Sequence, residues 1–100
     1  MKAALDPQAI IEAVSRRMSV PVAVIMNTSR GSAKTANARH LAAWLMRHGL
    51  SMTFTEIATA LRRRDHGSAM NSVETVEAWR GQDATIHLIT NQLLTAVRGD

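Results

Sequence analysis

Hydrophobic residues recur along this chain at intervals of three and four positions, which is the spacing of one face of an α-helix. The first such stripe comprises Ile10, Ile11, Val14 and Met18. It follows Asp6-Pro7, a pair that suits a helix start. Aspartate accepts hydrogen bonds from the free N–H groups of a first turn, and proline is tolerated there. The pattern predicts an amphipathic helix that begins at Pro7.

The next segment, 19–26, reads SVPVAVIM and is compatible with either a strand or a short helix. Its valines and isoleucine favour a strand, whereas Pro21 and the lack of a pairing partner favour a helix. We expect the short helix. Residues 27–35 are polar and basic, and we expect a loop there.

A second stripe, from residue 36 to Gly49, contains Leu41, Trp44, Leu45 and His48. Thr53 and Glu56 then have the spacing of a capping box, in which each side chain bonds a free N–H group of the first turn. They predict a short helix over 54–61, whose apolar residues are Phe54, Ile57, Ala58 and Leu61.

Two more helices are expected after Arg62-Arg63-Arg64. Asp65 caps one with apolar positions at Ala69, Met70, Val73, Val76 and Trp79, and Gly81 is expected to end it. Asp83 caps the last one, with Ile86, Ile89, Leu93 and Val97 on one side. The sequence therefore predicts one all-α domain over 1–100, a compact bundle of five to six helices without a sheet.

The positive charge is concentrated in the middle of the chain. Between Arg30 and His66 there are seven arginines and lysines against two acidic residues, whereas the rest has five against six. A solvated surface suits scattered charges better than this asymmetry does. The distribution favours a polyanionic partner, with an acidic protein as the alternative.

Several classes of protein do not fit the composition. There are three aromatic residues, too few for the stacking platforms of single-strand binders. The absence of cysteine removes disulfides and thiolate metal sites. No apolar run approaches the roughly 20 residues of a membrane span. The N-terminus lacks the apolar stretch of a secretory signal, so we expect a cytoplasmic, nucleoid-associated protein without a membrane partner.

No catalytic, metal or nucleotide site is predicted. The segment Gly31 to Thr35 lacks the first glycine, the second glycine and the preceding strand of a phosphate-binding loop. His40 and His48 share a helix face but stand more than about 10 Å apart along its axis. No carboxylate or cysteine is spaced to complete a metal site. We therefore expect neither a cofactor nor enzymatic activity.

Helix 54–61, a tight turn and the helix after Asp65 have the spacing of a helix-turn-helix, whose second helix enters the major groove of DNA. Asp65 can accept from cytosine, Ser68 can donate or accept, and His66 can contact a base edge or a thymine methyl group. By spacing alone, a plain helical hairpin with a basic turn is about as good an interpretation. The charge asymmetry favours DNA.

The stretch from Met52 to Val76, MTFTEIATALRRRDHGSAMNSVETV, resembles the helix-turn-helix of the C-terminal DNA-binding domain of the DnaA family, the bacterial chromosomal replication initiators. The family's hallmark is Arg-Asp-His followed by two Ser/Thr residues, and Arg64-Asp65-His66 carries it here. Upstream, Ala38 to Ala42 resembles the family's Arg-Gln-containing helix. The resemblance implies a Trp-repressor-like helical fold, covers nearly the whole chain and implies duplex DNA as the partner.

The resemblance implies a role for each matching residue. Asp65, His66 and Ser68 contact bases in the major groove, and Arg30 lies in a loop that enters the minor groove. The residues expected at the DNA backbone are Lys34, Arg39, His40, Arg47, Arg62, Arg63, Arg64 and Asn71. His40 stands where the family usually has glutamine.

The sequence departs from the family in four places that bear on DNA binding. Gly67 replaces the first Ser/Thr and removes one base-reading hydroxyl. Arg62-Arg63 replace a glycine-rich turn, Gly31 replaces a second basic residue, and Ala58 takes a position that is usually glycine. The family's ATPase domain has no counterpart in these residues.

We therefore expect a stand-alone DNA-binding domain that occupies short AT-rich duplex sites similar to DnaA boxes and regulates replication or transcription. The alternative is a protein-interaction module that binds a full-length initiator or another acidic partner without base-specific DNA recognition. Neither hypothesis requires a nucleotide, and the oligomeric state stays open.

Overall fold

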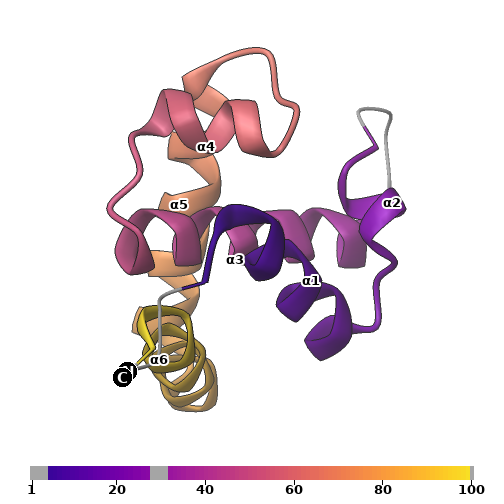
Figure 1. The fold of residues 1–100 in the computed structure, drawn as a ribbon. Coiled ribbons are helices and arrows are strands. Elements are labelled where there is room, and N and C mark those ends of the chain that lie inside the picture. The colour runs from indigo at the N-terminus through magenta and orange to yellow at the C-terminus, as the bar shows by residue number, and fades with distance from the viewer. Residues whose placement is uncertain (1–4, 28–31, 100) are drawn as a thin grey trace.

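The computed structural model describes residues 5–27 and 32–99, and these residues form six α-helices and no strand. The helices are α1 (Pro7–Met18), α2 (Val22–Ile25), α3 (Ala33–Gly49), α4 (Phe54–Ala60), α5 (His66–Gln82) and α6 (Ala84–Arg98). Figure 1 shows α3 crossing the middle of the molecule, with α4 above it and α6 below it. The expected all-α class is confirmed, as is the short helix after Pro21.

Two helix boundaries differ from the sequence-based expectation. α3 begins at Ala33 rather than near residue 36, because the Ser32 hydroxyl accepts a hydrogen bond from the Thr35 N–H at 3.2 Å and caps the helix. α5 continues through Gly81 to Gln82, so this glycine does not end it. The end comes at Asp83, whose carboxylate accepts from the N–H groups of Thr85 and Ile86 and starts α6 at once.

The long helix α3 is the centre of the fold. α1, α2, α4, α5 and α6 all pack on it, and six consecutive residues from Leu41 to Met46 are buried. A helix that is covered on nearly all sides cannot have a polar face in its middle, and this stretch of α3 is apolar throughout. The hydrophobic core is therefore arranged around α3, and the other helices are placed by their contacts with it.

A polar cluster joins α3, α5 and α6. Trp44 on α3 donates its indole N–H to Glu77 Oε1 on α5 at 2.9 Å. The Arg80 guanidinium lies 4.7 Å from the centroid of the Trp44 ring and donates to the Thr90 hydroxyl and to Asn91 Oδ1 on α6. Glu77 and Arg80 stand almost one turn apart on α5. This end of α5 therefore holds α3 and α6 in register.

Gly49, the last residue of α3, packs closely against α6. A Cβ atom built on Gly49 would stand 2.5 Å from Val97 Cγ1 and 3.3 Å from Val97 Cβ. Val97 is itself buried, so its side chain has little room to move. Glycine at this position allows the close contact between the two helices.

We expect Gly49→Ala to lower the free energy of unfolding by about 1–3 kcal/mol, because the added methyl group overpacks the contact with Val97. Urea unfolding followed by circular dichroism measures this. Gly81→Ala is the matched control, because its Cβ would have no neighbour within 4 Å. Relief of glycine's conformational entropy should stabilise that variant by about 0.5–1 kcal/mol. Equal stability of the two variants would contradict the close-contact argument.

Candidate nucleic-acid interface

The turn between α4 and α5 is closed by two backbone hydrogen bonds. Arg62 N–H donates to Thr59 O at 3.1 Å, and Arg63 N–H donates to Ala58 O at 2.7 Å. This pairing is the Schellman motif of helix C-termini, which requires a left-handed residue after the last helical turn. Arg62 adopts that conformation with φ of 56°. The position where the family has glycine therefore keeps the backbone that glycine prefers, at the cost of strain in an arginine.

Asp65 caps α5 and opens the candidate recognition surface. Its Oδ1 accepts a hydrogen bond from the Ser68 N–H at 3.1 Å, as the sequence predicted. Beyond it, the solvent-exposed residues of the first turns follow helical spacing, and they are His66, Gly67, Met70, Asn71 and Glu74. Ser68 is half-buried beside this face. The face is small, and the carboxylate of Glu74 bounds it on the C-terminal side.

Met70 differs from its sequence-based interpretation. The apolar pattern placed it among the buried positions of α5, but its side chain is 37% exposed. It lies on the same face as His66, one turn further along the helix. An apolar side chain there can contact the methyl group of thymine, so Met70 joins the candidate base-contacting residues. Its spacing of four from His66 is the signal that could have placed it there.

Gly67 lies directly beside the cap. A Cβ at this position would stand 3.1 Å from Asp65 Oδ1, which is tighter than ordinary contact. A serine or threonine here, as in the family hallmark, therefore requires the Asp65 side chain to give way slightly. Glycine leaves the cap undisturbed and leaves this exposed edge of the first turn without a side chain.

A cluster of positive side chains lies where α3 meets the turn. Arg39 donates its Nε–H to Ile25 O at 3.2 Å, and its Nη2 is buried without a hydrogen-bond partner. Arg63 has two such atoms, Nε and Nη2. Next to Arg39, the Nδ1 atom of His40 is bonded to the buried Ser72 hydroxyl at 2.8 Å. Unsatisfied buried donors are costly in a folded protein, so this cluster holds like charges and unpaired donors together at a cost to stability.

The electrostatics of this cluster show that its members affect one another. Burial lowers the pKa of His40, and the charges of Arg39 and Arg63 lower it further. Burial and the charge of Arg63 lower the pKa of Arg39, and burial lowers the pKa of Arg63. These two arginines therefore make the surroundings of His40 positive. The contribution of Arg63, which lies in the turn between α4 and α5, was not visible in the spacing of the sequence.

The other residues predicted from the sequence differ in whether their side chains are exposed or bonded within the chain. Lys34, Arg62 and Arg64 are exposed. Arg47, by contrast, donates to Met52 O at 2.9 Å and lies 4.4 Å from the centroid of the Phe54 ring, so it holds the loop between α3 and α4. Arg30 falls outside the described residues.

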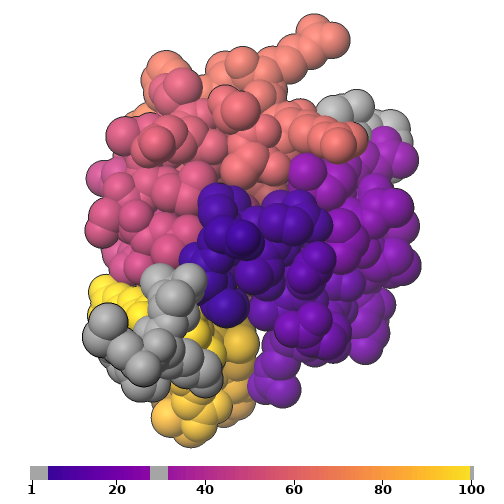
Figure 2. Space-filling model, viewed as in Figure 1, coloured from indigo at the N-terminus to yellow at the C-terminus, as the bar shows by residue number. Residues whose placement is uncertain are grey.

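Figure 2 shows α4 and the turn after it forming one end of the molecule, with side chains projecting from it, and α6 at the opposite end. Among the described residues, no group of three His, Asp or Glu side chains is placed to hold a metal ion. No helix among them is long and apolar enough to cross a membrane.

Two helices joined by a three-residue turn and a cap, with the second helix opening after a run of arginines, define a helix-turn-helix. The comparison with known families agrees with this class. Residues 7–76 match the family described as the bacterial DnaA protein helix-turn-helix, and the chain belongs to that family.

Two relatives in the family are full-length initiators. The chain is 32% identical over 81 residues to the chromosomal replication initiator protein DnaA of Aquifex aeolicus, and 33% identical over 98 residues to that of Spiroplasma citri. These matches cover 80% and 94% of the chain. They cover 20% of each relative, so the chain spans about one fifth of the initiators it matches.

We expect Arg62→Gly to raise the free energy of unfolding by about 1 kcal/mol, because it removes the strain of a left-handed arginine. Thermal or urea unfolding measures this. Arg62→Ala is the matched control, since it removes the same charge and keeps a Cβ atom in the left-handed position. If alanine stabilised the protein as much as glycine, the gain would come from relief of charge repulsion and the strain argument would be wrong.

The lowered pKa of His40 makes stability depend on pH. The unfolded chain binds the His40 proton more tightly than the folded protein, so the contribution is fully present above about pH 6.5 and is lost as the pH falls through the folded-state pKa. Between about pH 7 and pH 5, the free energy of unfolding should therefore fall more steeply in the wild type than in His40→Gln. His87→Gln, at an exposed position on α6, is the control. Parallel profiles of wild type and His40→Gln would contradict the assignment.

Proposed function

We propose that this protein binds short duplex DNA sites by placing the first two turns of α5 in the major groove. The observation that carries the proposal is the exposed and capped N-terminus of α5, which follows directly on the exposed Arg62 and Arg64 of the turn. Phosphate oxygens are strong acceptors that pair well with arginine. A DNA backbone along the turn pairs with these arginines while the adjacent helix end faces the bases.

Base readout is assigned to the exposed edge of α5. Asp65 accepts from the amino group of cytosine through the carboxylate oxygen that does not cap the helix, and His66 and Ser68 bond base edges. Met70 contacts a thymine methyl group. The family hallmark has two hydroxyl side chains after Arg-Asp-His. Gly67 replaces the first of them, so one fewer side chain is available to read the base sequence.

Backbone contacts position the helix without reading sequence. Arg39 and Arg63, whose positive charges lie close together, are assigned to a phosphate, with His40 beside them. Arg62 and Arg64 take phosphates that flank the groove. Further contacts are assigned to Lys34, Arg47 and Asn71, and Arg30 is assigned to the minor groove.

The biological role proposed is regulation of replication initiation or of transcription by occupancy of such sites. Both relatives are named as chromosomal replication initiators, and residues 7–76 of this chain match the helix-turn-helix of the DnaA family. AT-rich sites similar to DnaA boxes are the first candidates.

The test is a titration of a labelled duplex that carries the AT-rich box of the initiators against a duplex with the same bases scrambled. Salt is held at one concentration near 0.15 M, because phosphate contacts make affinity strongly salt-dependent. Tighter binding to the box duplex supports the proposal. Equal binding to both duplexes, or none, would favour the protein-interaction module over a sequence-specific DNA-binding protein.

Two variants separate the assigned roles. His66→Ala should cost about 1–3 kcal/mol of binding free energy on the box duplex and little on the scrambled one, because it removes a base contact. Arg64→Ala should weaken both by a similar factor, because it removes a phosphate contact. Both side chains are exposed, so neither change should unfold the protein. The reverse pattern would mean that α5 does not face the bases.

A further inference from the structure

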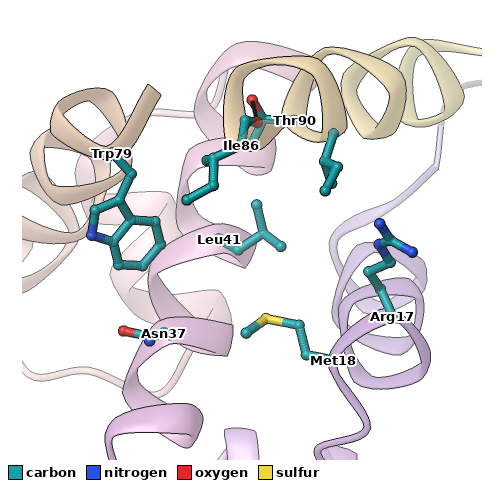
Figure 3. A pocket seen from close by; sticks show the side chains of 8 residues that line it. Arg17, Met18, Asn37, Leu41, Trp79, Ile86 and Thr90 are labelled. Carbon is teal, nitrogen blue, oxygen red and sulfur yellow. Dashed lines mark hydrogen bonds between the residues drawn. The ribbon is translucent and has the colours of Figure 1, made fainter. Parts of the chain in front are cut away.

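A second surface feature lies away from the turn, between α1, α3, α5 and α6. It is an open groove of about 550 Å³, shown in Figure 3. Met18, Leu41, Trp79, Ile86 and Ile89 form its apolar wall. Leu41 lies at its centre on α3, with Met18 from α1 on one side and Ile86 from α6 on the other.

The proposed DNA contacts do not use this groove. None of the side chains assigned to bases or phosphates lines it. Trp79 follows His66 by thirteen residues on α5, which places it about 20 Å further along the helix axis. His40, which is assigned to the DNA backbone, lies next to Trp79, with ring centroids 6.0 Å apart. The groove is therefore distant from the proposed base contacts and adjoins one proposed backbone contact.

The family-model match ends at residue 76, whereas Trp79, Ile86 and Ile89 of the groove follow it.

The polar groups of the groove indicate the charge of its occupant. Arg17 stands at one end, and no acidic residue lines the groove. Neither Arg17 nor Asn37 has a hydrogen-bond or ion-pair partner among the described residues. The Thr90 hydroxyl is already engaged by Arg80 and by Ile86 O. The free groups are thus a guanidinium and an amide, which complement a carboxylate.

We propose that this groove binds an acidic amphipathic helix of a protein partner, with an apolar side chain seated between Met18 and Ile89 and a carboxylate on Arg17. The openness of the groove supports a helix over a small molecule, because small-molecule sites bury most of the ligand surface. Helix-in-groove recognition uses a few apolar anchors and leaves the rest of the helix in solvent. The protein then connects a DNA site to a protein partner.

The probe is an acetylated peptide of about 18 residues with leucines along one helical face and glutamates elsewhere. It is titrated into the full chain while the two tryptophan indole N–H signals are followed by NMR. Saturable shifts are expected for Trp79, which lines the groove, and not for Trp44, which is buried and bonded to Glu77. The same peptide with lysine in place of glutamate should bind at least about tenfold more weakly.

Two variants with matched controls locate the site. Ile89→Glu should abolish peptide binding, whereas Leu88→Glu, on the same helix but 58% exposed and outside the groove, should keep it within about twofold of wild type. Arg17→Glu should weaken binding about tenfold, and its exposed neighbour Arg16→Glu should change it little. Circular dichroism checks that each variant is folded.

Three results would overturn the proposal. The first is the absence of saturable shifts at Trp79. The second is equal binding of the glutamate and lysine peptides, or of folded Ile89→Glu and wild type. The third is self-association of the wild type, by sedimentation without peptide, that Ile89→Glu removes, since the occupant is then a second copy of the chain. DNA binding by Ile89→Glu should equal that of wild type, so this proposal and the proposed function fail separately.

Discussion

The backbone of the α4–α5 turn is the constraint on which the candidate binding surface depends. Its two hydrogen bonds require a left-handed residue, and Arg62 takes that conformation although it is not glycine. The turn is then short, because only three residues separate Leu61, the last cap of α4, from Asp65, the first cap of α5. The same turn carries Arg63, which lies near Arg39, so the proposed phosphate and base contacts begin from one local structure. A longer or looser turn would separate them.

The strain at Arg62 belongs with a second cost in the same region. Arg39 and Arg63 lie close enough to lower the pKa of Arg39 and of His40, and three of their guanidinium nitrogens are buried without acceptors. Like charges and unpaired donors both destabilise a fold. Conflicts between local preference and the fold are expected to concentrate at functional sites. Here two of them coincide at the place where the chain is proposed to meet a polyanion.

Helical periodicity and caps were enough to predict most of the architecture, because Asp6, Thr53, Asp65 and Asp83 all cap the helices they precede. Sequence reasoning was wrong where two signals competed. Gly81 was taken as a helix end, yet the Asp83 cap one residue after Gln82 decides the boundary. Met70 was counted among the apolar positions of its helix, yet its side chain is exposed. The Arg39–Arg63 cluster and the groove at Trp79 join segments far apart in the sequence, and periodicity within one helix carries no information about such contacts.

The cap at Asp65 has a consequence for the kind of base the proposed interface reads. One carboxylate oxygen is held by the Ser68 N–H, so the side chain is ordered before DNA arrives and little rotamer entropy remains to be lost on binding. The second oxygen can only accept. An asparagine would cap the helix equally well and would present an amide N–H in place of that oxygen. The substitution would replace a hydrogen-bond acceptor with a donor and leave the backbone unchanged. The preferred base would then shift from cytosine toward bases that offer acceptors in the major groove.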